Sequence, residues 1–157
     1  ERIQWFAAKY ANAKDVFFIG RNFDYAVAME ASLKLKEISY MHSEAYAAGE
    51  LKHGTISLIE PGTPVFAVAT QPDLFEKTLG NIREVKSRGA YVAALVGEDC
   101  ENAGEFSDVA IKVPSTLPEY MPSLNVVPLQ LIAYFTAVER GCDVDKPRNL
   151  AKSVTVE

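Results

Sequence analysis

The sequence lacks the features that mark several large protein classes. Its 157 residues include two cysteines, Cys100 and Cys142, which make neither a disulfide framework nor a metal-ligand spacing. We therefore expect free thiols in a reducing cytoplasm. The net charge of −5 is opposite in sign to the basic surface that nucleic-acid binding requires. Because no apolar run approaches the length of a membrane span and no secretory signal is visible, we expect neither membrane insertion nor export.

The short motifs of common enzymes are also missing. The sequence contains no G-x-G-x-x-G, no P-loop, no H-E-x-x-H and no G-x-S-x-G. In "GRN", which follows the first apolar run, we interpret Gly20 as part of a tight strand-to-helix turn. The later loop "TQPDLF" is a poor phosphate cradle, since Asp73 adds negative charge and Pro72 has no N–H group. The chain begins with Glu rather than Met, and we expect it to be a fragment of a longer protein.

Apolar runs and helical patterns alternate along the chain. Strands are expected at 15–20, 63–70, 90–97 and 108–114. Helices are expected at the N-terminus, over 23–40, as a shorter piece within 41–54, over 73–88, and in a last segment ending near Arg140. Continuous apolar strands separated by helices are typical of a parallel sheet covered on both faces. We therefore predict a three-layer α/β/α domain over residues 1–141, followed by a docked tail at 142–157. A ligand is expected beyond the carboxyl ends of the strands.

The helix expected at 23–40 has an unusual charged strip. Glu30, Lys34 and Glu37 fall within roughly 60° of one another on a helical wheel, between two apolar arcs. One interpretation is a pair of ordinary surface salt bridges at i,i+4 and i,i+3. The other is a carboxylate held partly out of water beside a lysine, which can serve as a general base. The flanking apolar arcs favour the second interpretation, but the sequence alone leaves both open.

Three further residues stand in segments where chemistry is possible. His53 lies in the Gly-flanked turn "ELKHGT", where it is either a structural hydrogen-bonding group or a catalyst. His42 is expected to provide a favourable charge or a cap near the end of the preceding helix. Lys152 lies in the tail "DVDKPRNLAKSVTVE", and it is either a surface lysine or an amine delivered to a site by the tail.

Two long segments resemble a known family. The segments "EASLKLKEISYMHSEAYAAGELKHG" and "PLQLIAYFTAVERGCDVDKPRNLAKSVTVE" are similar to the glucosamine-6-phosphate synthases, the isomerising glutamine–fructose-6-phosphate aminotransferases. The similarity is to the second of their two sugar-isomerase (SIS) modules. It implies a three-layer SIS fold and the conversion of fructose 6-phosphate, with ammonia from glutamine, to glucosamine 6-phosphate. It also implies that no metal or organic cofactor is needed.

The resemblance assigns roles to individual residues. Glu37 matches the glutamate that moves a proton between C1 and C2 of the sugar, and Lys34 matches the lysine beside it. His53 matches a histidine that helps to open the sugar ring and that comes from the partner subunit of a dimer. Lys152 matches the lysine that forms an imine with the open-chain sugar. Ala151 and Arg148 are expected to contact the substrate.

The resemblance also implies what the chain lacks, and two alternatives remain. The family's first SIS module, with its phosphate-binding loop, and its glutaminase domain are missing from the sequence, so we expect this chain to be inactive alone. One alternative is another SIS enzyme, a sugar-phosphate deglycase or deaminating isomerase. The other is a non-catalytic module that senses sugar phosphates. The tail with Lys152 argues against both, because a sensor needs no amine there and the other enzymes are not expected to share it.

Overall fold

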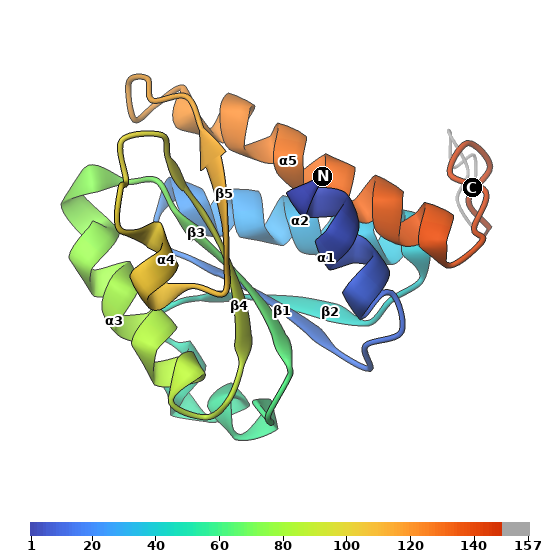
Figure 1. Ribbon diagram of the computed structural model, residues 1–157, viewed down its shortest axis with the longest axis horizontal. Helices are drawn as coiled ribbons and strands as arrows, with labels where there is room; N and C mark the ends of the chain where they lie inside the picture. The colour runs from blue at the N-terminus through green and yellow to red at the C-terminus, as the bar shows by residue number, and fades with distance from the viewer. Residues whose placement is uncertain (149–157) are drawn as a thin grey trace, which may run out of the picture.

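The sheet at the centre of the molecule consists of five parallel strands in the order β2-β1-β3-β4-β5 (Figure 1). The structure is a computed structural model and describes residues 1–148. The strands are β1 (Val16–Gly20), β2 (Ser43–Ala47), β3 (Pro64–Ala69), β4 (Tyr91–Gly97) and β5 (Val109–Val113). The α-helices are α1 (Arg2–Tyr10), α2 (Phe23–Ser39), α3 (Phe75–Lys86), α4 (Ala103–Phe106) and α5 (Met121–Glu139). Short 3-10 helices are η1 (Leu51–His53), η2 (Thr55–Leu58) and η3 (Pro72–Leu74).

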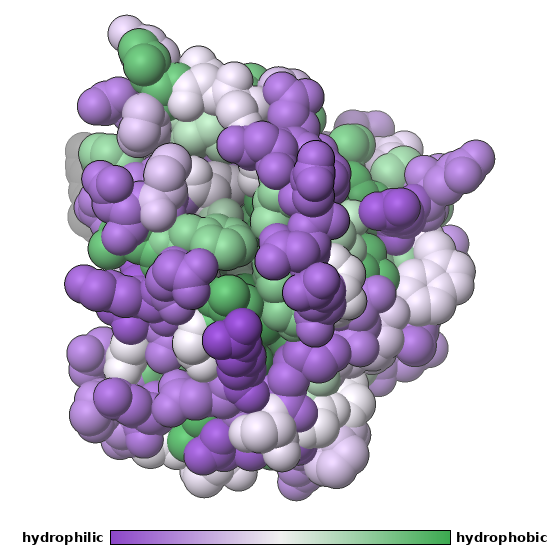
Figure 2. Space-filling view, turned by 60° about the vertical axis from the view of Figure 1, so that its left-hand side comes forward, coloured by the Kyte–Doolittle hydropathy of each residue, from purple (hydrophilic) through white to green (hydrophobic). Residues whose placement is uncertain are grey.

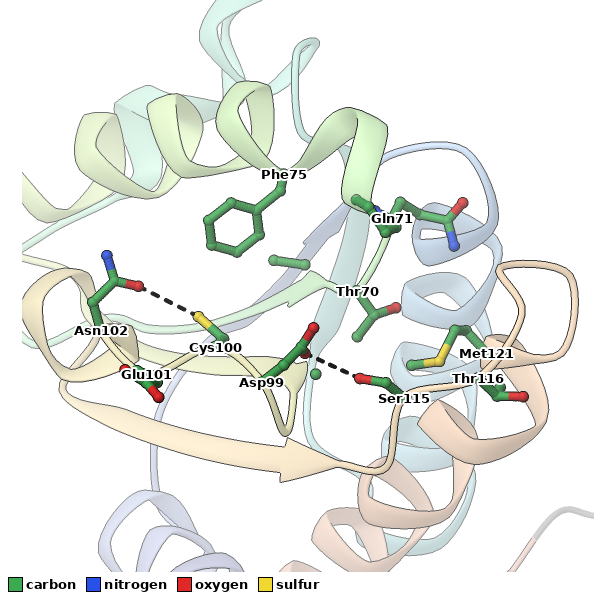
Figure 3. A pocket seen from close by; sticks show the side chains of 13 residues that line it. Thr70, Gln71, Phe75, Asp99, Cys100, Glu101, Asn102, Ser115, Thr116 and Met121 are labelled. Carbon is green, nitrogen blue, oxygen red and sulfur yellow. Dashed lines mark hydrogen bonds between the residues drawn. The ribbon is translucent and has the colours of Figure 1, made fainter.

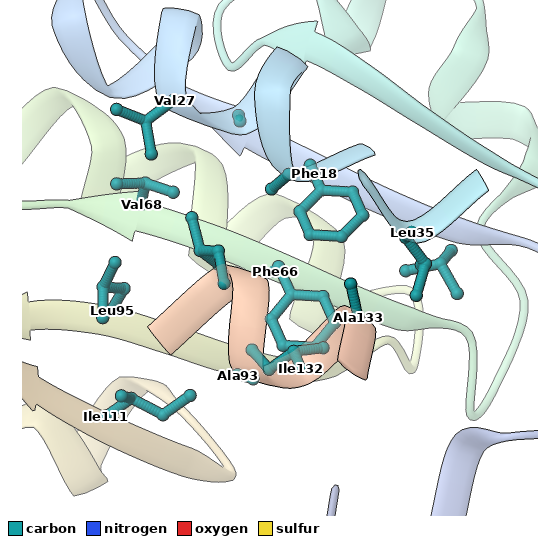
Figure 4. Packing of buried hydrophobic residues seen from close by; sticks show 14 of the residues in the cluster. Phe18, Val27, Leu35, Phe66, Val68, Ala93, Leu95, Ile111, Ile132 and Ala133 are labelled. Carbon is teal, nitrogen blue, oxygen red and sulfur yellow. The ribbon is translucent and has the colours of Figure 1, made fainter. Parts of the chain in front are cut away.

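Helices cover both faces of this sheet, which confirms the predicted three-layer architecture. Helices α1, α2 and α5 lie on one face, and α3 and α4 lie on the other (Figure 1). Each face has its own hydrophobic cluster. On the α2 side, Phe18 and Phe66 are paired across β1 and β3, and their rings stack with centroids 5.0 Å apart (Figure 4). Such an aromatic pair adds about 0.5–1.5 kcal/mol to the stabilisation that burial provides.

Strand β2 was not predicted, since a short helical piece was expected within 41–54. Its sequence, "SEAYA", favours a helix by local propensity, and four of its five side chains are only partly buried because it is an edge strand. Pairing with β1 decides its conformation, since Val16 to Gly20 align with Ser43 to Ala47 in parallel register. The expected helical turns appear only afterwards, as η1 and η2.

The turn between β1 and α2 is tight, as predicted from Gly20. A Cβ atom on Gly20 would lie 2.5 Å from the backbone carbon and oxygen of Asp24, so no other residue fits without movement. Asn22 caps α2 with a φ of 51°, in the left-handed half of backbone space. The first turn of α2 is thereby pressed against the end of β1.

Helix α5 is long and predominantly apolar, and it ends at Glu139, next to the predicted end near Arg140. By length and composition alone it could cross a membrane, which corrects the expectation that no apolar run approaches that length. Its inner side, however, is part of the domain core: Leu129, Ile132 and Ala133 are buried against α2 and the sheet. The core helix of a domain and a membrane span pass the same test of length and composition.

Candidate functional site

The charged strip on α2 forms the two ion pairs that its spacing predicts. Lys34 Nζ lies 2.5 Å from Glu37 Oε2 and 3.7 Å from Glu30 Oε1. The side chain of Glu37 is 24% exposed, that of Lys34 33% and that of Glu30 42%. Glu37 is therefore the more enclosed carboxylate and the closer partner of the lysine.

This pairing fixes the charge of the lysine. The hydrogen bond to Glu37 raises the pKa of Lys34, so Lys34 is an ammonium at neutral pH. Within the described residues 1–148, only Lys34 donates a hydrogen bond to Glu37, and it does so to one oxygen. The other oxygen can accept a proton from a ligand, while the ammonium stabilises the carboxylate. A base beside a fixed cation is a suitable arrangement for moving a proton on carbon.

Only one of the two apolar arcs beside the strip packs into this domain. Val27, Ala31 and Leu35 are buried against the sheet and α5, whereas Met29 is 46% exposed and Leu33 43% exposed. Helix α2 starts at the carboxyl edge of the sheet and runs back toward the start of β2. Glu37 thus lies on the outer surface of α2 near the amino edge, away from the carboxyl edge where we expected the ligand.

The described part of the C-terminal tail docks beside this strip. Tyr40 caps α2 one turn beyond Glu37, and its hydroxyl accepts a hydrogen bond of 2.8 Å from the backbone N–H of Arg148. The guanidinium carbon of Arg148 lies 4.0 Å from the centre of the Tyr40 ring, within cation–π range. No sign of this role for Tyr40 is visible in the sequence, because its partner lies 108 positions further along the chain. Ala151 and Lys152 lie outside the described residues.

His53 does not approach Glu37 within the chain. It is exposed on η1, and the surrounding segment packs through Leu51 and Ile59 into the hydrophobic cluster of α3 and α4. Helix α2 packs on the opposite face of the sheet, so the sheet separates the two side chains. Within one copy of the chain, His53 and Glu37 therefore do not share a site.

The segment leading to His53 is held by a contact that the sequence did not reveal. Arg21 donates two hydrogen bonds, of 2.9 and 3.2 Å, to the side-chain oxygen of Asn81 on α3. Its guanidinium lies so close to Gly49 that a Cβ there would be 2.8 Å from the nearest nitrogen. His42 has a partner that was not expected: its Nδ1 lies 2.7 Å from Asp15 Oδ1, so its ring pairs with a carboxylate on the loop before β1.

A cavity of about 510 Å³ lies at the carboxyl edge of the sheet, beyond β3 and β4. Thr70, Gln71 and Phe75 line one side, and Asp99 and Ser115, joined by a 3.0 Å hydrogen bond, line the other (Figure 3). Two carboxylates on the cavity lining, Asp99 and Glu101, make the cavity unattractive to anions.

The face seen in Figure 2 is mainly hydrophilic, with hydrophobic side chains grouped toward its middle.

Neither a metal nor a thiol nucleophile is indicated in residues 1–148. No group of three or more His, Cys, Asp or Glu residues is placed there to hold a metal ion. Cys100 lines the cavity, but burial raises the pKa of its thiol, with the charge of Asp99 acting in the same direction and Lys112 opposing it. A raised pKa leaves little thiolate at neutral pH.

Comparison with known proteins identifies the family. The SIS domain model matches residues 9–140. The glutamine–fructose-6-phosphate aminotransferase (isomerizing) of Caldanaerobacter subterraneus subsp. tengcongensis is 65% identical over all 157 residues, and that of Clostridium acetobutylicum is 57% identical. The chain spans 26% of the length of each relative.

A solved structure has the same fold as this chain, and its name matches those of the two relatives. The C-terminal domain of glucosamine-fructose-6-phosphate aminotransferase from Francisella tularensis matches with a TM-score of 0.87 and 35% identity, over 92% of this chain and 41% of that one. These similarities confirm the resemblance found in the two sequence segments, and they do not favour the deglycase or the sensor. The chain belongs to the SIS domain family.

Proposed function

We propose that this chain is the C-terminal SIS module of an isomerising glutamine–fructose-6-phosphate aminotransferase, which makes glucosamine 6-phosphate for amino-sugar synthesis. The high sequence identity between this chain, over its whole length, and isomerising aminotransferases supports this proposal. The structural observation that carries it is the docking of Arg148 on Tyr40, one turn from Glu37. Lys152 is four residues beyond Arg148, and four extended residues reach at most about 14 Å. This reach from the anchored Arg148 supports the assignment of Lys152 to the same site as Glu37.

The reaction follows from a lysine and a carboxylate that share one substrate. Lys152 forms an imine with C2 of open-chain fructose 6-phosphate and releases water. Ammonia then displaces the lysine amine, which leaves an imine of ammonia at C2 that acidifies the hydrogen on C1. Glu37 takes that proton as a carboxylate and returns it at C2 as the carboxylic acid, which leaves the amine on C2 and an aldehyde at C1. The ammonium of Lys34 keeps Glu37 ionised before the first step and after the second. Ala151 and Arg148 contact the sugar.

The remaining groups come from outside the chain. Because the sheet separates His53 from Glu37, the proposal assigns the ring-opening histidine to the partner subunit of a homodimer. The first SIS module supplies the phosphate site, and a glutaminase domain supplies ammonia. Exposed apolar residues on the adjacent helices α2 and α5 offer a surface for these partners, among them Met29, Leu33, Leu131 and Tyr134.

The division of the chain follows from the same reasoning. Residues 1–141 form the SIS domain, and residues 142–157 form a tail that carries the catalytic lysine. Without the phosphate site and the ammonia source, the 157-residue chain is inactive alone. The two free cysteines are consistent with a cytoplasmic location.

The proposal is tested by substituting the two carboxylates of the strip separately. In the full-length aminotransferase, Glu37→Gln is expected to slow exchange of the C1 hydrogen of the sugar with solvent by roughly 10²–10⁴-fold, the usual contribution of a general base. Glu30→Gln is the matched control, since Glu30 pairs with the same lysine at 3.7 Å but is more exposed. Exchange at a near wild-type rate in Glu37→Gln, or an equal loss in both variants, rules out Glu37 as the base.

A further inference from the structure

The strand order singles out one point on the carboxyl edge of the sheet. Strands β2 and β3 lie on opposite sides of β1. The chain therefore passes from β1 to β2 on one side and then crosses to β3 on the other side. Ligands of open parallel sheets bind at such a switch point, between the loops that follow the two central strands. Here these are the loop after β1, which leads to Asp24, and the loop after β3, which begins at Thr70.

A carboxylate of the chain itself occupies this point. Asp24 is 1% exposed. Its Oδ2 accepts hydrogen bonds from the backbone N–H groups of Thr70, at 2.8 Å, and of Gln71, at 3.3 Å. Its Oδ1 accepts from the Thr70 hydroxyl, at 2.7 Å, and from the side-chain amide of Asn125 on α5, at 3.4 Å. The same amide also donates to the Thr70 hydroxyl, at 2.7 Å.

All four groups that reach the carboxylate are neutral donors. In residues 1–148 no lysine, arginine or histidine forms an ion pair with Asp24. Consecutive backbone N–H groups, a hydroxyl and an amide that converge on one point are the donor set with which proteins bind phosphate and similar oxyanions. Burial raises the pKa of Asp24, and the hydrogen bonds from Thr70 and Gln71 oppose this effect by favouring the ionised form.

We infer that the end of β3 carries an anion-binding cradle that the chain fills with its own Asp24 carboxylate, which makes Asp24 the residue that excludes phosphate groups from this position. Thr70 and Gln71 also line the cavity of about 510 Å³, so removal of the Asp24 carboxylate opens the cradle to phosphate from the cavity, against the negative charge of Asp99 and Glu101 in the same lining. The inference differs from the expectation drawn from Asp73 and Pro72. Both are exposed, whereas the buried donors of the loop are already used by Asp24. It stands independently of the proposed function.

The test uses inorganic phosphate and the 157-residue chain. Asp24→Ala is expected to unfold at a lower temperature than wild type in chloride, because three buried donors on Thr70 and Gln71 lose their acceptor and the Asn125 amide loses one of its two acceptors. Phosphate at equal ionic strength should then raise its melting temperature by roughly 3–6 °C for each tenfold by which phosphate exceeds its dissociation constant. Wild type and Asp73→Ala, which loses an exposed carboxylate from the same loop, measure the general stabilising effect of phosphate.

Each outcome decides the inference. A phosphate-dependent rise in Asp24→Ala that exceeds both controls supports it, and so does calorimetric binding of phosphate to that variant alone. An equal rise in the melting temperature of all three proteins overturns the inference. A rise in Asp73→Ala as large as that in Asp24→Ala also overturns it, because the charge of the exposed loop would then exclude phosphate. If Asp24→Ala is unfolded in chloride, circular dichroism should show that phosphate restores its fold. Asp24→Ser, which keeps a smaller acceptor, is measured in parallel. Failure of phosphate to fold or stabilise either variant beyond the controls also overturns the inference.

Discussion

Replacing Tyr40 by Phe tests whether the tail is held against α2. The substitution removes the hydroxyl that accepts the 2.8 Å hydrogen bond from the Arg148 backbone and leaves the aromatic ring. A hydrogen bond of this kind contributes about 1 kcal/mol net, which corresponds to roughly a fivefold change in an equilibrium constant. Arg148→Ala removes the complementary contact, the cation–π interaction at 4.0 Å, which is worth about 0.5–1 kcal/mol at an exposed site. The two effects share one docking equilibrium, so they need not add.

The assay is the rate at which borohydride traps fructose 6-phosphate on the full-length aminotransferase. Tyr40→Phe is expected to trap the sugar roughly two- to fivefold more slowly, because the tail spends less time beside Glu37. Arg148→Ala is expected to be at least as slow, because it also loses the proposed contact with the sugar. Tyr120→Phe is the matched control, since Tyr120 lies at the start of α5, at the opposite end of that helix from the tail. Wild-type trapping rates in both Tyr40→Phe and Arg148→Ala would refute the reasoning that this contact positions the tail. An equal slowing in Tyr120→Phe would show that the effect is not specific to the contact.

Two further predictions concern the packing of α2 and the thiol in the cavity. Leu35→Ala, at a 2% exposed position, should lower the free energy of unfolding of the 157-residue chain by about 2–5 kcal/mol in urea. Leu33→Ala, at a 43% exposed position, should change it by about 0.5 kcal/mol or less, and equal losses would contradict the assignment of the two faces. In a Cys142→Ser background, iodoacetamide should alkylate Cys100 slowly at pH 7. Because the pKa of Cys100 is raised, the rate should still be increasing above pH 9, and a rate that levels off below pH 8 would contradict the assignment.

The parts of the fold that could be predicted depend on contacts local in the sequence. Strands β1, β3 and β4 are almost entirely buried, so each is a continuous apolar run that can be recognised in the sequence. The i,i+3 spacing of Lys34 and Glu37 likewise predicts their ion pair. Strand β2 escaped prediction because an edge strand with half-exposed residues has no such pattern, and only its pairing with β1 makes it extended.

The network around Asp24 could not be predicted for a related reason. Its donors lie 46, 47 and 101 positions further along the chain, at Thr70, Gln71 and Asn125. Only the fold brings them together. The place of Glu37 on the outer surface of α2 was likewise hidden, because a helical wheel shows which residues share a face but does not show what covers that face.

The most direct test of the account is to identify the residue that carries the trapped sugar. Borohydride is added to the full-length aminotransferase with fructose 6-phosphate, and the modified peptide is mapped. We predict that the adduct is on Lys152, and that it still forms in Glu37→Gln, where exchange of the C1 hydrogen is lost. An adduct on Lys34 or Lys36, or the absence of any adduct, would contradict the claim that the docked tail delivers its lysine to the site of Glu37.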